Sequence, residues 1–176
     1  MTKYIYALIL IFFSFSAFAD NYSDAWKGYH SGKYDEALQS FSDLAREGNV
    51  YAQVIVGIQH AAEYRYADIK ESSPYNPSAV LSKITDMHNS GDIEATFLLA
   101  LMHDEGWAAI KNDDLSKNFI MIAAKAGNTA AQAHLAEYYE LGADREHGVK
   151  KAIYWYKKAA ESGSIWAKQK LNLLSK

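Results

Sequence analysis

The chain has 176 residues, with 18 basic and 21 acidic side chains and a formal net charge of −3 at neutral pH. It contains no cysteine, which excludes a disulfide scaffold, a cysteine nucleophile and thiolate metal ligands. A net acidic chain without a basic groove signature is not expected to bind nucleic acid. Its length suffices for one domain that is held together by its apolar core.

The first residues have the pattern of a secretory signal peptide. Lys3 precedes an apolar run that is short for a bilayer span, and the small-x-small triplet Ala17 to Ala19 precedes Asp20. We therefore expect residues 1–19 to be cleaved on export, which leaves residues 20–176 as the mature repeat domain in the periplasm or outside the cell. No later stretch reaches the length of a membrane span, so none is expected after cleavage.

The rest of the sequence repeats itself around four glycines. Each glycine is followed at once by Asn, Asp or Ser, four residues later by Ala, and eight residues later by Val or Leu. Glycine adopts the left-handed conformation that ends a helix, and Asn, Asp and Ser are preferred first caps of the next helix. Each joint is thus predicted to end one helix and begin another. The glycines are Gly48, Gly91, Gly127 and Gly163.

Amphipathic helices are predicted to lead into three of these joints, because apolar residues recur with helical spacing in 35–48, 115–127 and 150–163. A second set of glycines is expected to turn the chain inside each hairpin: Gly32, Gly106 and Gly142. The predicted fold is all-α, a right-handed α-α superhelical solenoid of about four helix-turn-helix repeats with a C-terminal capping helix. The expected units are about 24–48, 49–91, 92–127 and 128–163, followed by the cap at 164–176.

The second repeat departs from the pattern. It is longer than the others, has Glu63 in place of the hairpin glycine, and contains both prolines of the chain. A longer loop is therefore expected from Tyr64 to Ser78. Repeat packing does not account for the tyrosines of this loop or for Trp107, which follows a turn glycine. We expect these residues either to contact a partner or, in the loop, to pack over a neighbouring hairpin: Tyr64, Tyr66, Tyr75 and Trp107.

The small and aromatic residues of residues 130–168 resemble the Sel1-like repeat family, a branch of the tetratricopeptide-type α-solenoids. The resemblance spans about residues 24 to 174, although the acidic residue usual before the second helix is Asn112 in one unit and Gly148 in another. It implies a stack whose concave face binds proteins or peptides, and exported members often act in the envelope or in contact with a host. The residues that carry it are Leu135, Ala136, Tyr139, Gly142, Lys151, Ala152, Trp155, Ala159, Ala160, Gly163 and Ala167.

No motif for catalysis, for a cofactor or for a metal ion stands out. The sequence lacks Ser-x-x-Lys, a helical pair of histidines for zinc, a G-x-G-x-x-G turn and a Walker lysine. His60, His103 and Tyr139 occupy equivalent repeat positions, so a regular stack would place them in a row that binds a ligand. The alternative is that these rings fill the hairpin turns.

The expected function is that of an exported, non-catalytic adaptor that binds a peptide or an envelope or host protein. Gln53, Gln59 and Gln132 are expected to supply polar contacts on the inner face. An alternative is an enzyme or binder of cell-wall or β-lactam compounds, as the resemblance implies for the family's cysteine-rich branch. This chain lacks those cysteines, so that activity is not carried over.

Overall fold

The structure is a computed structural model, and it describes residues 21–29, 31–67, 75–142 and 145–174. The predicted signal peptide lies outside the described residues. Within these ranges, helices alternate with short turns and there is no strand, as the sequence predicts. The chain divides into two compact units, residues 1–56 and residues 57–176, which are described separately.

The first unit contains a helix over residues 21–29, α2 (Tyr34–Arg46) and the start of α3 (Val50–Ala67). Its core is aromatic. The ring centroid of the buried Phe41 lies 5.6 Å from that of Tyr22 and 5.3 Å from that of Trp26, and both pairs of rings meet edge to face. Such pairs stabilise a small core beyond the area that they bury.

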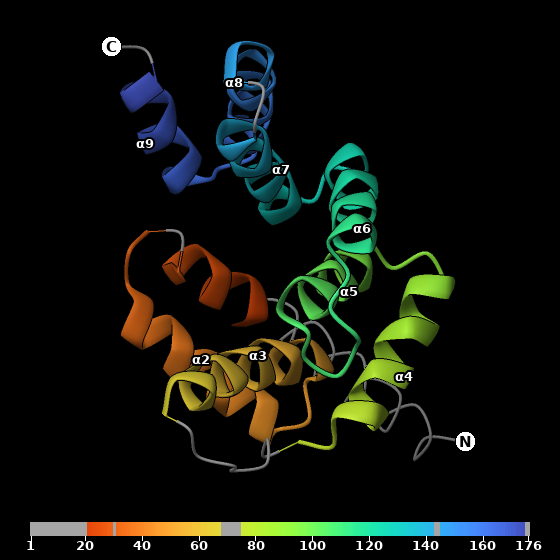
Figure 1. Cartoon of the computed structure of the whole chain (residues 1–176). Coiled ribbons are helices and arrows are strands. Elements are labelled where there is room, and N and C mark those ends of the chain that lie inside the picture. Colours follow the sequence, from red (N-terminus) through yellow and green to blue (C-terminus); the bar gives the residue numbers. More distant parts are fainter. Residues whose placement is uncertain (1–20, 30, 68–74, 143–144, 175–176) are drawn as a thin grey trace, which may run out of the picture. The chain divides into compact units, whose positions relative to one another are not determined.

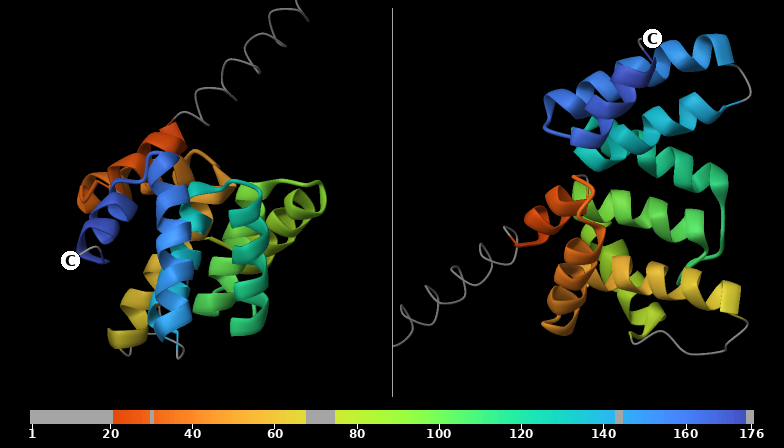
Figure 2. Two further views of the ribbon diagram at one scale, coloured as in Figure 1. Left: turned by 90° about the horizontal axis from the view of Figure 1, so that it is seen from above. Right: turned by 90° about the vertical axis from the view of Figure 1, so that its left-hand side faces the viewer.

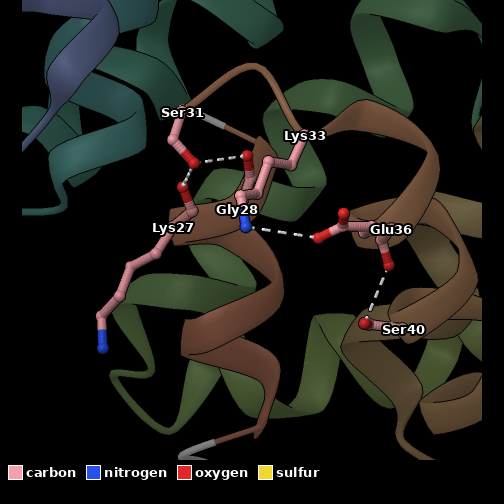
Figure 3. Close-up of polar contacts among 6 residues, drawn as sticks. All are labelled: Lys27, Gly28, Ser31, Lys33, Glu36 and Ser40. Atoms are coloured by element: carbon pink, nitrogen blue, oxygen red, sulfur yellow. Dashed lines mark hydrogen bonds and ion pairs between the residues drawn. The ribbon is translucent and has the colours of Figure 1, made fainter.

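The turn before α2 is fixed by polar contacts (Figure 3). The Ser31 hydroxyl donates to the carbonyl oxygens of Lys27 and Gly28, at 2.8 and 2.9 Å. Lys33 Nζ lies 3.5 Å from a carboxylate oxygen of Glu36 in the first turn of α2. The first helix therefore ends, and α2 begins, through local interactions.

The second unit continues with six helices, each of which packs against the next in chain order (Figure 1). The right-hand view of Figure 2 shows its successive hairpins one above another. Each of these helices buries one or more small or apolar side chains. The helices are α4 (Pro77–Asn89), α5 (Ile93–Glu105), α6 (Asp113–Lys125), α7 (Thr129–Leu141), α8 (Arg145–Glu161) and α9 (Ile165–Leu174).

The four predicted joints share one geometry. At the joint between α6 and α7, Gly127 has φ = 97°. Its N–H donates to the backbone carbonyl of Ala124, and the N–H of Asn128 donates to the backbone carbonyl of Ala123. This is a Schellman ending. The same Asn128 then accepts from the N–H of Ala131, at 2.7 Å, and caps α7. The other joints repeat both features at Gly48, Gly91 and Gly163, with caps Asn49, Asp92 and Ser164.

The alanine that stands four residues after each joint glycine is fully buried. Its N–H is the donor that the cap residue satisfies, so its backbone position is fixed, and its small side chain lets a neighbouring helix approach. The joint glycines meet nothing within 4 Å at the place of a Cβ atom, so their positive φ, and not crowding, requires glycine. The alanines are Ala52, Ala95, Ala131 and Ala167.

The predicted loop from Tyr64 to Ser78 is wrong at both ends. Helix α3 continues to Ala67, because no glycine or proline interrupts it once Glu63 replaces the hairpin glycine. Helix α4 already begins at Pro77, where a missing N–H costs nothing, and Asn76 caps it by accepting from Ala79 at 3.2 Å.

Gly142 also differs from the other hairpin glycines. It ends α7 in an extended conformation, with φ = −64°, whereas Gly32 and Gly106 are left-handed. The glycine that matters sterically in this repeat is Gly148, inside α8: a Cβ atom there would collide with the carbonyl oxygen of Tyr139. The family's usual acidic residue is absent at this position because α7 and α8 approach too closely for a side chain.

Candidate functional site

The loop between α5 and α6 is tied tightly to the end of α5. The N–H of Trp107 donates to the carbonyl of Met102 at 3.1 Å, and that of Asn112 donates to the carbonyl of His103 at 2.9 Å. Lys111 Nζ donates to the carbonyl of Asp104 at 2.5 Å. This bracing leaves Ile110 88% exposed, although its side chain is fully apolar.

His103 holds this loop directly. Its Nδ1 lies 3.0 Å from the carbonyl oxygen of Ile110. A carbonyl only accepts, so Nδ1 carries the proton and donates. The imidazole also stacks on Phe119 of α6, with ring centroids 6.0 Å apart and planes 21° apart. His103 therefore holds the hairpin loop that presents Ile110, in agreement with the alternative that its ring fills the hairpin turn.

A second histidine reaches the same Phe119 from α4. The hydroxyl of Thr96 donates to the carbonyl of Asp92 at 2.8 Å, so it accepts from His88 Nδ1, also at 2.8 Å. The His88 ring meets Phe119 edge-on at 5.2 Å. Phe119 thus lies in contact with two imidazoles, and this cluster joins α4, α5 and α6. We refer to His88, His103, Phe119 and the loop residue Ile110 as the histidine–loop cluster.

Tyr139 is half-buried at the end of α7, and Lys151 Nζ of α8 lies 5.2 Å from its ring centroid. This distance is within the range of a cation–π contact. His60 is half-buried in α3. The contacts that the structure gives His103 and Tyr139 lie between neighbouring helices, and a common ligand for the predicted row of His60, His103 and Tyr139 stays a prediction.

Packing explains Trp107, contrary to the expectation from the sequence. The indole is only 5% exposed and lies against Gly57 of α3, where a Cβ atom would overlap the ring. Tyr64 and Tyr66 fall on the last turns of α3, with side chains outside the described residues, and Tyr75 is half-buried just before α4. Partner binding by these tyrosines stays a prediction.

Two of the three glutamines expected on a binding face have internal roles. Gln53 Nε2 donates to the carbonyl of Ala45, and Gln132 Nε2 donates to that of Ala124, each at 3.2 Å. Both occupy the fifth position after a joint glycine, where the amide bonds to the last turn of the preceding helix. Gln132 is also buried, so the prediction that it contacts a partner is wrong. Gln59 is half-buried.

Comparison with protein-family models gives a match to the Sel1 repeat over residues 93–128 and 129–164. These two segments are Sel1 repeats. They run from α5 through α6 and from α7 through α8, so each contains one complete hairpin. The resemblance that the sequence predicted is confirmed. Sel1 repeats typically mediate protein–protein interactions, and their fold is typically non-catalytic.

Solved structures of Sel1-repeat proteins confirm the α-solenoid class. One is c5321, described as a protective antigen present in uropathogenic Escherichia coli strains and displaying an SLR fold; it is 25% identical over 78% of this chain, with a TM-score of 0.52. Another is a Sel1 repeat protein from Oxalobacter formigenes, 23% identical over 80% of this chain, also with a TM-score of 0.52. This chain spans 28% and 53% of their respective lengths. No curated protein matches it.

The histidine–loop cluster lies mostly in the first Sel1 repeat, with His88 contributed by the preceding helix. The repeat also exposes apolar residues on α6, namely Leu115 (40%) and Ile122 (50%), which the sequence analysis did not select. Their spacing of seven residues on a helix was the signal that could have identified them. Ile110 had no such signal, because its exposure depends on the loop conformation.

A partly buried polar network links the second Sel1 repeat to α9. The hydroxyl of the fully buried Tyr156 donates to Glu140 at 2.6 Å, and Lys170 Nζ lies 3.2 Å from the same carboxylate. Burial, then the bond to Glu140, raises the pKa of Tyr156 far above its ordinary value, so the phenol stays a neutral donor. The network orients α9 on the repeat.

Burial perturbs the titration of His134, which lies in the same repeat. Desolvation lowers its pKa below the ordinary 6.5, and the charge of Asp104 opposes this in part. Its ring lies 5.4 Å from that of Phe97 in α5. The neutral imidazole is therefore the form that fits between the two Sel1 repeats.

Within the described ranges, no helix is long and apolar enough to cross a membrane. The same residues hold no group of three or more His, Cys, Asp or Glu side chains arranged for a metal ion.

Proposed function

We propose that this Sel1-repeat protein is an exported, non-catalytic interaction module that binds a peptide or an envelope or host protein. The observation that carries the proposal is the rigid presentation of Ile110 by the first Sel1 repeat. An apolar residue that is 88% exposed, and whose backbone carbonyl is held by His103, has little backbone freedom left to lose on binding.

The surroundings of Ile110 suit a protein partner. Leu115 and Ile122 add exposed apolar surface on the adjoining helix α6. Lys111 and Asp113, which pair at 3.4 Å, supply a polar rim beside the loop. Apolar anchors surrounded by polar groups are typical of protein interfaces. Tyr139 and the other residues predicted from the sequence, namely His60, Tyr64, Tyr66 and Tyr75, would extend the contact surface.

Export is supported by the signal-peptide pattern of residues 1–19. The similar structure from uropathogenic Escherichia coli strains is described as that of a protective antigen, and an antigen must be accessible to the immune system. This supports a site of action in the periplasm or outside the cell.

The proposal is tested by affinity capture with the mature chain from the envelope and supernatant fractions, followed by quantification of the captured protein. We expect Ile110→Asp to lower recovery of the main partner at least about tenfold, because the partner would bury this side chain and a buried charge is strongly unfavourable. Lys83→Asp on the exposed face of α4 serves as the control and should leave recovery unchanged. Tyr64→Ala/Tyr66→Ala/Tyr75→Ala tests the three tyrosines in the same assay and is expected to reduce recovery of the partner.

Three results would contradict the proposal. Equal recovery with Ile110→Asp would exclude the loop as the anchor. Turnover of a chromogenic β-lactam or of muropeptides by the purified chain would contradict a non-catalytic role. An uncleaved chain found in the cytosol would contradict export.

A further inference from the structure

Helix α8 exposes a compact group of lysines around an aromatic ring. Lys150, Lys151, Lys157 and Lys158 are all exposed, and Tyr154 between them is 54% exposed. We call these five residues the α8 lysine face. It belongs to the second Sel1 repeat and does not include any residue of the histidine–loop cluster.

The five side chains share one side of the helix. They recur at intervals of three and four residues, whereas Ala152, Tyr156 and Ala159 on the opposite side are fully buried. The two lysine pairs are seven residues apart, or about 10 Å along the helix axis. Tyr154 therefore lies between two positive sites at a spacing that a short peptide can reach.

Among the described residues, none of the four lysines of this face forms an ion pair with a carboxylate, although the exposed Glu161 lies one helical turn beyond Lys157 and Lys158. The one ion pair in the described part of the chain that involves a lysine after residue 149 is Lys170 with Glu140, on α9. Lys158 Nζ lies 6.0 Å from the ring centroid of Tyr154, and the Tyr154 ring meets Trp155 edge-on at 5.2 Å. The aromatic ring is thus supported from the helix side and remains open to solvent.

Lys151 is one of the residues that carry the Sel1 resemblance, but the fold of this chain does not require a lysine or a tyrosine at these positions. In the first Sel1 repeat, the positions equivalent to Lys151, Tyr154 and Lys158 are occupied by Leu115, Asn118 and Ile122 on α6. Both helices end in the same Schellman joint and bury the equivalent alanines. The lysines and the tyrosine therefore reflect something other than the packing of the repeat.

We propose that the α8 lysine face is a second docking surface, which binds an acidic protein segment with an apolar or aromatic residue between two acidic groups. The positive charge complements such a segment, and Tyr154 offers the apolar contact between the charges. A phosphate ligand is disfavoured because the face has no arginine fork, which is the preferred group for bidentate phosphate recognition. The surface goes beyond the proposed function, because it contains neither Ile110 nor any other residue proposed to bind the first partner; Lys151 contacts one of those residues, Tyr139.

The proposal is tested by fluorescence anisotropy with labelled helical peptides that carry two glutamate pairs about seven residues apart and a leucine between them. We expect saturable binding to the mature chain that weakens as salt rises. Lys157→Glu/Lys158→Glu should weaken binding at least about tenfold, and Tyr154→Ala should weaken it without changing net charge. Lys157→Gln/Lys158→Gln is measured in parallel, in case the charge reversal disturbs folding.

Lys83→Glu/Lys125→Glu provides the matched control, because both lysines are exposed and the net charge changes by the same amount. It should bind the peptide like the wild type. Equal weakening by this control, or no saturable binding to the wild type, would overturn the proposal. So would tighter binding to vesicles rich in phosphatidylserine, or to a DNA duplex, than to the peptide. Ile110→Asp should not affect peptide binding, which separates this result from the test of the loop.

Discussion

The close approach of α7 and α8 makes a specific prediction for Gly148. A Cβ atom at this position would overlap the carbonyl oxygen of Tyr139, which belongs to the backbone and cannot rotate away. Gly148→Ala should therefore force α8 away from α7 within the second Sel1 repeat.

The expected cost follows from two opposing terms. Overpacking by one methyl group typically destabilises by up to about 3 kcal/mol, and contact with a backbone atom places Gly148→Ala near that upper value. Alanine in a helix offsets about 1 kcal/mol of this through its higher propensity. The net loss is about 2 kcal/mol, which corresponds to a decrease of about 4–8 °C in Tm for a chain of this size.

Urea and thermal unfolding followed by circular dichroism would measure this loss. Gly28→Ala is the control, because its Cβ atom would lie 3.6 Å from that of Ala37, an ordinary contact, within the helix of residues 21–29. The control should keep or slightly raise stability through the same propensity gain. If Gly148→Ala were as stable as Gly28→Ala, the tight packing of α7 on α8 would be refuted.

Three further predictions concern polar groups of the Sel1 repeats. Asn128 caps α7 and also donates through Nδ2 to the carboxylate of Glu94 at 2.7 Å. Asn128→Asp should therefore lower the free energy of unfolding in urea by about 2 kcal/mol, whereas Asn112→Asp, at a cap without such an acceptor, should leave it unchanged. Equal effects of the two substitutions would contradict a stabilising bond between Asn128 and Glu94. The lowered pKa of His134 means that the unfolded chain binds this proton more tightly. Stability should therefore decline as pH falls from about 6.5 through the lower folded pKa, and His134→Gln should remove that part of the slope in unfolding measured against pH. Tyr156→Phe should lose about 1.5–3 kcal/mol because it deletes the bond to Glu140, and unchanged stability would show that the network does not orient α9.

The sequence predicts the joints well because their chemistry is local. A glycine with positive φ, the cap beside it and the alanine four residues later lie within five consecutive residues. Because this pattern occurs four times in the sequence, a chance occurrence does not explain it. The helical identity of the chain and its Sel1 resemblance follow from the same periodic positions. A small error arose at the expected loop from Tyr64 to Ser78, because helix α3 continues to Ala67 and α4 already begins at Pro77.

The candidate site was less predictable because its contacts join distant positions. Trp107 packs on Gly57, and His88 meets Phe119, across separations that no single repeat period encodes. The exposure of Ile110 depends on hydrogen bonds between backbone groups and on His103, none of which has a sequence signature. Residue type indicated aromatic anchors, whereas the structure favours an aliphatic residue held by a histidine.

Site-specific photo-crosslinking in cells that export the chain tests the central claim most directly. A photoreactive phenylalanine analogue replaces Ile110 in one variant and Lys83, which is also exposed, in the other. The proposed function predicts one covalent adduct of defined mass from the position of Ile110 and none from that of Lys83. No adduct at Ile110, or the same mixture of adducts at both positions, would contradict it.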